Sequence, residues 1–446
     1  MGITRGKWLA PIAAAAAAGL VMAGCSSSTT ASTTTTTTSA ASSTTAASGG
    51  GSAAPGVTAT SITIGVISSR SGILAGYFGQ FAPGMTAYID ALNAKGGVNG
   101  RKINLAYNLD DGGSPSQFTQ LTHTLIDQDH VFAVGAASPF FSPGYFAQSG
   151  TPTYGYNVTG NWSPYPNLFA AGGSIQDYSS AVPTYAYFVK ATHSKSIGFI
   201  SYGPSIPSSY DACSTAAAGL KAAGVNVNFV DVGGQLGGSF TSDVQRLQQA
   251  GSEALISCMQ GSDNVTLARD IQQYGLSIKQ LWLNGYDQNL LNQYSSVMQG
   301  VYMSNAGNVP FSAQAYPSVY PGMAAYVAAM NKYEPQYTTS NLALSGWQSG
   351  ALLAEGIRAA GSDLTQANVI AATNKITDDT AAQTQAPTNW TLAHVKATFP
   401  ACTSWVQVKG SNFVSVFSTG KQVFVCLSGD AKNPVPVTPP AGTPGA

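Results

Sequence analysis

The stretch SITIGVI at residues 61–67 has the apolar, β-branched composition of a buried β-strand. A glycine-rich loop follows it, and the chain then enters a segment with an apolar stripe. The stripe consists of Met85, Tyr88, Ile89 and Leu92. Their i, i+3, i+4, i+7 spacing places them on one face of an α-helix. This part of the chain therefore predicts a strand, a loop and a helix in succession.

The same alternation continues along the chain. Further strands are predicted at 102–107, 131–134, 152–156, 196–201, 225–230, 254–258 and 280–284. Further helices are predicted at 178–192, 211–223, 240–250 and 264–274. Strands that alternate with helices predict an α/β fold with parallel sheets covered on both faces, and two successive series indicate two similar lobes. Residues 342–376 have a helical pattern, and 404–427 favour antiparallel strands.

The N-terminal segment has the pattern of a secretory leader. Arg5 and Lys7 precede an apolar, alanine-rich run at 8–24 that ends in small residues. The run ends in Met-Ala-Gly before Cys25, which resembles a lipoprotein processing site. We expect a signal peptide over 1–24 and a diacylglycerol on the Cys25 thiol. An ordinary leader with an incidental cysteine is the alternative.

The two ends of the chain flank the predicted fold. Residues 26–53 contain only Ser, Thr, Ala and Gly, so they cannot bury apolar area, and a disordered linker is predicted over 25–57. The Pro-rich end predicts a disordered tail over 428–446. Because no later segment is apolar enough to span a bilayer, we expect an exported protein anchored by lipid on the outer face of the cytoplasmic membrane.

Composition and charge limit the classes of protein to which this chain can belong. The 446 residues hold 19 Lys+Arg against 19 Asp+Glu, and only 9% are charged. A net charge of zero argues against a nucleic-acid binder, which needs a basic face. Hydrophobic residues make up 44% of the chain, enough for a sizeable core.

Four cysteines remain once Cys25 is set aside: Cys213, Cys258, Cys402 and Cys426. Four cysteines allow three pairings, and export favours disulfides. A Cys402–Cys426 bond would brace a terminal hairpin, and a Cys213–Cys258 bond could then lie within one domain. Four buried thiols are the alternative, and no Cys-x-x-Cys motif points to a metal site.

The loops after the strands are the place to search for a site, because ligands of such sheets bind beyond the carboxyl ends of the strands. The loops at 68–79, 135–146 and 157–165 are rich in hydroxyls, glycines and aromatic rings, and they carry one charge, Arg70. That composition suits a small organic ligand held by backbone N–H groups, hydroxyls and aromatic walls. We expect about half of the extra aromatic residues to line the site, namely Phe140, Phe141, Tyr145, Tyr154, Tyr156 and Trp162.

Other polar signals favour structural roles. Asp110 and Asp111 lie in the turn DDGGSP, where hydrogen bonds to their own backbone are likelier than a metal site. The four histidines lack ligand spacing, and the sequence has no Gly-x-Ser-x-Gly elbow and no P-loop. We therefore expect no metal, no cofactor and no enzymatic activity.

A family resemblance rests on these residues. The run Asn-Ala-Lys-Gly-Gly-Val-Asn-Gly-Arg at 93–101 is its most specific element, and Ile64-Gly65-Val66 with Ser71-Gly72 precedes it. Asp110-Asp111, Tyr210 and the helical stretch 350–372 continue the pattern. Most of 58–427 resembles type 1 periplasmic binding proteins, in particular the leucine/isoleucine/valine-binding branch of ABC importers.

The resemblance implies two doubly wound, Rossmann-like lobes joined by three crossovers, with a ligand cleft between them. The first lobe would comprise 58–172 plus 307–390, and the second 173–306 plus 391–427. In this family the lobes close on the ligand, because only the closed form makes both sets of contacts.

The resemblance also assigns ligand-binding positions, some of which match the family pattern more closely than others. These are Tyr77, Ser138, Pro139, Phe140, Asn157, Thr159, Tyr202, Tyr210, Gly261, Tyr286 and Asp287. Tyr77 would cover the ligand side chain, the loop from Ser138 would bind its carboxylate, and Asn157 and Thr159 would hold its polar groups. Tyr202 and Tyr210 would flank the cleft.

Two further assignments concern the charge and size of the ligand. Either Asp287 or Tyr286 would meet an ammonium group, with Asp287 the main candidate. Pro139 and Gly261 depart from the family pattern, which argues against a plain branched-chain amino acid. The extra aromatic residues indicate a larger or aromatic ligand.

The function implied by the resemblance is capture of a small organic ligand, an amino acid or a related amide or aromatic acid. The expected partners are an ABC permease and its ATPase, with the binding protein itself a monomer. A sensor that reports ligand to a signalling partner is one alternative. An exported hydrolase is another, but it would need an activated nucleophile or an acid/base pair, which the sequence does not reveal.

Overall fold

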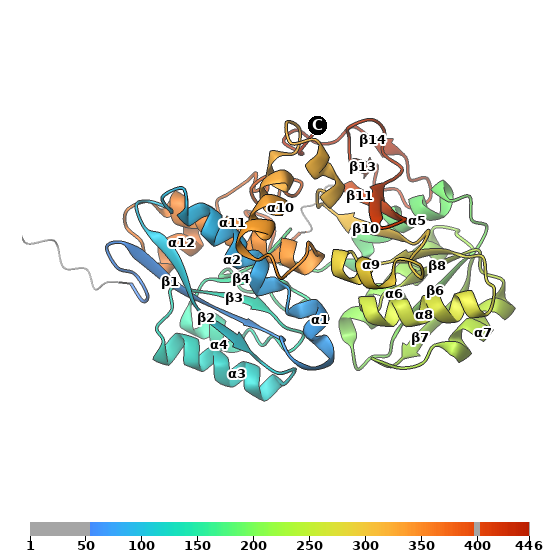
Figure 1. Ribbon diagram of the computed structural model, residues 1–446, viewed down its shortest axis with the longest axis horizontal. Coiled ribbons are helices and arrows are strands. Elements are labelled where there is room, and N and C mark those ends of the chain that lie inside the picture. Colours follow the sequence, from blue (N-terminus) through green and yellow to red (C-terminus); the bar gives the residue numbers. More distant parts are fainter. Residues whose placement is uncertain (1–53, 397–401, 446) are drawn as a thin grey trace, which may run out of the picture. The chain divides into compact units, whose positions relative to one another are not determined.

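The computed structural model describes residues 54–396 and 402–445. The predicted signal peptide, Cys25 and most of the predicted linker lie outside the described residues. Two sheets organise the described chain, and each has helices on both faces (Figure 1). The predicted α/β fold with two parallel-sheet lobes is confirmed.

The first lobe is built on a five-stranded parallel sheet in the order β2-β1-β3-β4-β5. Its strands are β1 (Ser61–Ser68), β2 (Lys102–Asp110), β3 (Ala133–Ala137), β4 (Thr153–Gly155) and β5 (Leu168–Ala170). Its helices include α1 (Ala75–Phe78), α2 (Phe81–Asn93), α3 (Pro115–His123) and α4 (Gly144–Ser149). Alternate residues of β1 face opposite layers, since Ile64 packs with α2 while Ile67 packs with Phe118 of α3.

Three later helices return to the first lobe: α10 (Pro321–Tyr333), α11 (Asn341–Ala360) and α12 (Gln366–Thr373). Helix α11 lies directly on α2, backbone against backbone. An added Cβ on Gly84 would lie 1.7 Å from the carbonyl oxygen of Ala343, and one on Gly346 would lie 2.0 Å from that of Phe81. Glycine is therefore required at both positions by the close approach of the two helices.

The second lobe is built on a nine-stranded mixed sheet, in which β7, β6, β8, β9 and β10 run parallel. These strands are β6 (Ile197–Tyr202), β7 (Val227–Gly234), β8 (Ala254–Ser257), β9 (Lys279–Trp282) and β10 (Tyr302–Ala306). Helices α5 (Val182–Ala191) and α6 (Pro207–Ala222) share one core with the sheet. Helices α7 (Thr241–Ala250) and α8 (Gly261–Gln273) share another core on the opposite face, and α9 (Gln288–Tyr294) follows β9.

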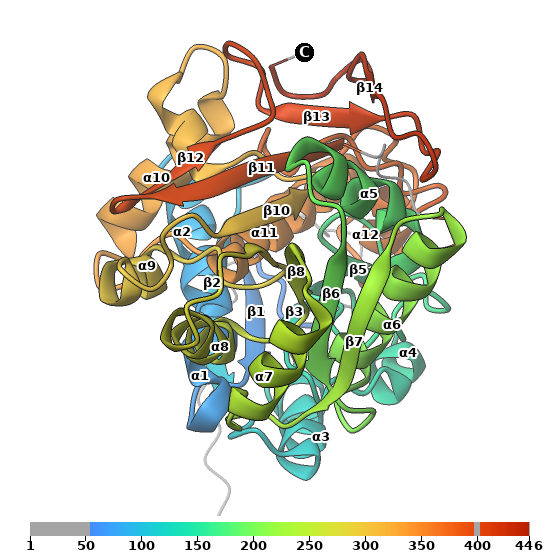
Figure 2. The same cartoon turned by 90° about the vertical axis from the view of Figure 1, so that its right-hand side faces the viewer.

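Antiparallel strands extend this second sheet, as 404–427 predicted. They are β11 (Cys402–Lys409), β12 (Asn412–Ser415), β13 (Phe424–Leu427) and β14 (Pro436–Val437), shown in red in Figure 2. The prediction of a disordered tail over 428–446 was wrong for the described part. Val437 pairs with Cys426, and Thr443 is buried, so the Pro-rich segment packs on the fold.

Both disulfides favoured by the sequence are present in the structure. Cys402 and Cys426 face each other across β11 and β13, and Cys213 of α6 is bonded to Cys258 after β8. Among the described residues, no helix is both long and apolar enough to cross a membrane.

Candidate functional site

The order of strands reverses between β1 and β3 in the first sheet and between β6 and β8 in the second. Ligands of doubly wound sheets bind at the carboxyl ends of strands near such a reversal. The residues that follow β1, β3 and β4 in the first lobe, and β6, β8 and β9 in the second, therefore define the candidate site.

Ser138, the first residue after β3, is fully buried. Its hydroxyl donates to the carboxylate of Asp111 and accepts the backbone N–H of Phe140 at 3.0 Å. The same Oγ lies 3.5 Å from that of Ser69, at the end of β1. The Ser138 hydroxyl is therefore engaged in fixing its own loop, which leaves the loop backbone as the group that could meet a ligand.

Asn157 and Thr159, which follow β4, also bond within the first lobe or at its exit. The Asn157 amide donates to the carbonyls of Gly173 at 3.3 Å and Ser174 at 3.1 Å, where the chain leaves the lobe. The Thr159 hydroxyl donates to Oδ1 of Asn161 at 2.6 Å. Asn157 thus braces the crossover at which the chain leaves the first lobe.

Tyr77 of α1 reaches the second lobe directly. Its phenol donates to Oδ1 of Asn284, just beyond β9, at 3.1 Å, and lies 3.3 Å from the phenol of Tyr156. The rings of Tyr77 and Phe78 meet edge to face at 5.2 Å. Burial, with Tyr156 and Asp287 nearby, raises the pKa of the Tyr77 phenol well above its ordinary value. The phenol therefore stays protonated and remains a donor.

Tyr202, at the end of β6, is a structural residue of the second lobe. It is buried, and its phenol donates to Oδ2 of Asp263 at 2.6 Å and accepts the backbone N–H of Gln260 at 3.1 Å. Both functions of its hydroxyl are used inside the lobe, and the ligand role of Tyr202 stays a prediction. Tyr210 is half-buried on α6.

Gly261 is buried at the first position of α8. A Cβ added to it would lie 2.8 Å from Leu290 and 3.4 Å from the backbone of Gly285. The space in which the family places an aromatic side chain is therefore filled here by the segment that follows β9.

The two residues of the pair at 286–287 differ in their surroundings. Tyr286 is 2% exposed, its ring stacks on Phe311 at 4.2 Å, and its hydroxyl accepts the Phe311 N–H at 2.7 Å. This side chain belongs to the core, so the structure favours Asp287, and the alternative that Tyr286 meets an ammonium group stays a prediction.

Asp287 forms the N-cap of α9 and keeps one oxygen available. Its Oδ1 accepts the backbone N–H groups of Asn289 at 2.7 Å and Leu290 at 3.1 Å. Within the described chain no residue bonds Oδ2. Burial raises the pKa of this carboxyl to about 6, although the two N–H groups oppose the shift. Asp287 also lies near enough to Tyr77 to raise the pKa of that phenol.

Most of the extra aromatic residues do not reach this region. Phe141 stacks on Trp162 at 4.3 Å in the core of the first lobe, which Phe140 partly joins, and Tyr154 is fully buried. The expectation that about half of these aromatic residues would line the site is therefore too high. Among them, Tyr156 is the residue whose phenol contacts that of Tyr77, which in turn donates to Asn284. Pro139, like Phe140, is half-buried in the loop after β3.

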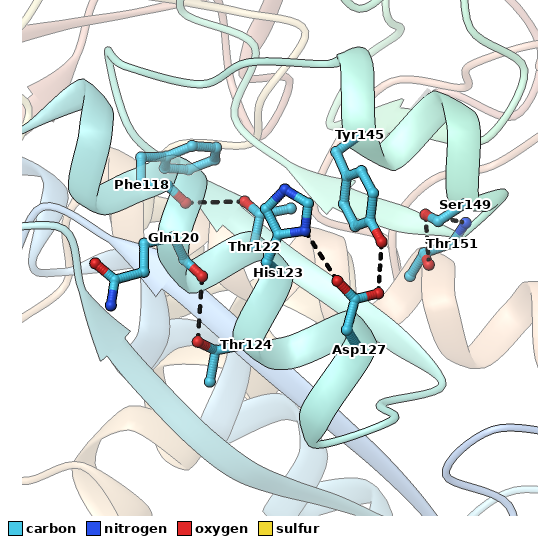
Figure 3. A network of polar contacts seen from close by, with 9 residues as sticks. All are labelled: Phe118, Gln120, Thr122, His123, Thr124, Asp127, Tyr145, Ser149 and Thr151. Carbon is cyan, nitrogen blue, oxygen red and sulfur yellow. Dashed lines mark hydrogen bonds and ion pairs between the residues drawn. The ribbon is translucent and has the colours of Figure 1, made fainter.

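Tyr145 belongs to a polar network on the surface of the first lobe (Figure 3). Its hydroxyl donates to Asp127 at 2.5 Å, and Nδ1 of His123 lies 2.9 Å from the other oxygen of that carboxylate. These two bonds lower the pKa of Asp127. The network joins α4 to the single π-helical turn at Thr124–Gln128, so it fastens two surface helices together.

Two residues near Tyr156 were not predicted. Gln176 donates to the carbonyl of Asn157 and accepts the phenol of Tyr178 at 2.8 Å, where the chain enters the second lobe. Asn284 was also missed. The predicted strand 280–284 included it, whereas β9 ends at Trp282 and leaves Asn284 in the loop that follows.

A sequence profile of the periplasmic binding protein family matches residues 61–412. An "Amino acid binding protein" of Pseudomonas aeruginosa is 36% identical over 73 residues, which is 16% of this chain and 19% of that protein. The match thus spans about a fifth of this curated relative.

Solved structures show the same fold. The fatty acid ABC transporter substrate-binding protein of Thermomonospora curvata has a TM-score of 0.69 at 18% identity, covering 87% of this chain and 97% of its own. The leucine-binding protein of Thermotoga maritima has a TM-score of 0.64 at 14% identity, covering 79% and 97% respectively. Because the family profile spans most of the sequence and the two-lobed fold agrees with it, this chain belongs to the periplasmic binding protein family.

Proposed function

We propose that this protein is an extracytoplasmic solute-binding lipoprotein that captures a small organic ligand between its lobes and delivers it to an ABC importer. The ligand is an amino acid, or a related amide or aromatic acid. The contact of Tyr77 in the first lobe with Asn284 in the second carries the proposal, because it lies at the carboxyl ends of both sheets. A ligand bound there touches both lobes and so favours their closed arrangement.

Asp287 supports an ammonium-bearing ligand. Its Oδ1 is held by two backbone N–H groups, so the carboxylate is fixed in orientation. Its Oδ2 bonds to no donor among the described residues, so it is available to a ligand. An ammonium group at Oδ2 would form a charge-assisted hydrogen bond, which is stronger than a neutral one.

The first experiment identifies the ligand. The full-length chain is purified and denatured, and the released small molecules are identified by mass spectrometry. A thermal-shift panel then tests them, since a ligand at about 100 times its dissociation constant adds about 2.7 kcal/mol to the free energy of unfolding. Small-angle scattering should show compaction with any ligand that binds, and absence of compaction would contradict lobe closure.

The second experiment tests Asp287. The Asp287→Asn variant keeps a side chain that can cap α9 but removes the negative charge. Affinity for an amine-bearing ligand should fall about tenfold or more, the range expected for a lost hydrogen bond to a charged group. Asp363→Asn, a matched change at an exposed carboxylate of the first lobe, should leave the affinity unchanged. Equal effects of both variants would contradict the role of Asp287.

A further inference from the structure

A chain of hydrogen bonds crosses from one lobe to the other through Tyr77. The single phenol proton of Tyr77 goes to Asn284, so the 3.3 Å contact between the two phenols has Tyr156 as its donor. The chain continues on the far side, where Nδ2 of Asn284 donates to the carbonyl of Met259 at 3.2 Å. Each link fixes the direction of the next.

The orientation of the Asn284 amide follows from these partners. A backbone carbonyl can only accept, so the atom that faces Met259 must be the NH2 group, and the atom that faces the first lobe must be the carbonyl oxygen. The backbone is held as well, because Asn264 donates to the Asn284 carbonyl at 2.9 Å. The second lobe thus presents a fixed hydrogen-bond acceptor toward Tyr77.

The first lobe presents the complementary group. Tyr77 is held edge to face by Phe78 at 5.2 Å and by Tyr156 at 6.3 Å between ring centroids. Nearby, Ile73 of the first lobe lies against the loop at Gly237 of the second, where an added Cβ would be 3.0 Å from the Ile73 side chain. The lobes are therefore in contact at this end through one polar and one apolar pair.

We propose that Asn284 selects ligands by their hydrogen-bond donors. This inference rests on the proposed function, because it takes the ligand to bind between the lobes. A ligand that separates Tyr77 from Asn284 must replace both partners, donating to Asn284 Oδ1 and accepting from the Tyr77 phenol. A primary amide or an amino acid carries both kinds of group.

An ionised carboxylate has only acceptors. It satisfies Tyr77 but leaves the Asn284 oxygen without a partner in a desolvated site, which weakens binding by about tenfold or more. The inference therefore favours amides and amino acids over aromatic or fatty acids that lack an N–H group.

Matched probe pairs test the selection. Isothermal titration compares 4-methylpentanamide with 4-methylpentanoate and 3-phenylpropanamide with 3-phenylpropanoate, with L-leucine and L-phenylalanine as amine-bearing probes. In the wild-type protein the amide of a pair should bind about tenfold tighter than the acid. Asn284→Leu should bring that ratio close to one, whereas Asn292→Leu, at an exposed position of α9, should preserve it. An acid that binds as tightly as its amide, or a ratio unchanged in Asn284→Leu, would overturn the inference.

The native ligand decides the remaining cases. If no probe binds, a released native ligand with an N–H donor supports the inference. One whose only polar group is an ionised carboxylate overturns it and leaves the binding function intact. A protein that neither releases nor binds a small molecule contradicts both.

Discussion

Tyr202 donates its phenol proton to Asp263 over 2.6 Å, inside the second lobe, and the same carboxylate oxygen accepts the backbone N–H of Gly237 at 2.8 Å. The bond ties the end of β6 to helix α8 and to the loop after β7. Burial and the Asp263 carboxylate raise the pKa of the Tyr202 phenol, so it remains a donor at all physiological pH values. A residue at a predicted ligand position thus supports the wall of the site.

Tyr202→Phe should therefore reduce stability and leave ligand affinity almost unchanged. Loss of the Tyr202 hydroxyl removes one hydrogen-bond donor from the buried carboxylate oxygen of Asp263, which lowers the free energy of unfolding by about 1–3 kcal/mol. Urea unfolding measures the first quantity and titration calorimetry the second. Tyr210→Phe, at a half-buried tyrosine on α6, is the control and should change stability little. Weaker binding by Tyr202→Phe without loss of stability would restore its predicted ligand role.

Gly84→Ala should strongly destabilise the first lobe. The new Cβ would overlap the backbone oxygen of Ala343 at 1.7 Å, and a helix backbone cannot move aside as a side chain can. We expect a loss of about 3 kcal/mol or more, at the upper end of the cost of overpacking. Gly144→Ala is the matched control in α4, where the added Cβ meets nothing within 4 Å. The control should gain about 0.5–1 kcal/mol from helix propensity, and equal losses in both variants would contradict the close packing of α2 on α11.

Affinity for an amine-bearing ligand should depend on the ionisation of Asp287. Its pKa in the ligand-free protein is raised to about 6, mainly by burial, with Tyr77 and Tyr326 as the titratable groups near it. An ammonium ligand prefers the ionised carboxylate, so affinity for L-leucine should fall as the pH drops below 6, by up to about tenfold per unit. Titration calorimetry between pH 5 and 7.5 measures this dependence. Asp287→Asn should bind weakly with no such slope, and a parallel slope in both proteins would exclude Asp287 as its origin.

Stability should fall as the pH rises through the range in which Asp379 ionises. This carboxyl is 1% exposed, and burial raises its pKa from 3.8 to about 6. The folded protein then binds more protons than the unfolded chain between these values, so the stabilising contribution is complete below 3.8 and is lost as the pH rises through 6. The slope from this group is at most about 1.4 kcal/mol per unit. Glu355, whose pKa is raised to about 7 by burial and the nearby aspartates, should extend the decline.

Asp379→Asn cannot ionise, so its unfolding free energy should decline less between pH 4 and 6.5. The absolute stability can also change, because Trp390 and the Ala381 amide both donate to this carboxylate, at 3.1 and 2.7 Å. The slope rather than the level is therefore the measured quantity, from urea unfolding at four pH values. Asp363→Asn at an exposed position should keep the wild-type slope. An unchanged slope in Asp379→Asn would assign the dependence to other groups.

Local patterns predicted most of the fold. The strand SITIGVI and the stripe from Met85 to Leu92 became β1 and α2, because a buried strand and an amphipathic helix are recognised over a few residues. Strands β5 and β10 were not predicted. Their strand conformation comes from pairing with β4 and with β9 and β11.

Less of the candidate site than of the fold could be predicted from the sequence. Two of the predicted site residues already have hydrogen-bond partners far along the chain: the Ser138 hydroxyl donates to Asp111, 27 residues away, and the Tyr202 phenol donates to Asp263, 61 residues away. A sequence motif cannot reveal that a hydroxyl already has a partner. Asn284 was missed for the converse reason, because its importance arises from a tyrosine 207 residues distant.

The periodicity of strands and helices was enough to predict the α/β class and the two-lobed organisation. The folded structure alone reveals which polar groups are already bonded within a lobe and which face the other lobe. A hydrogen-bonding group is saturated by one or two partners, and for buried groups those partners come from distant parts of the chain.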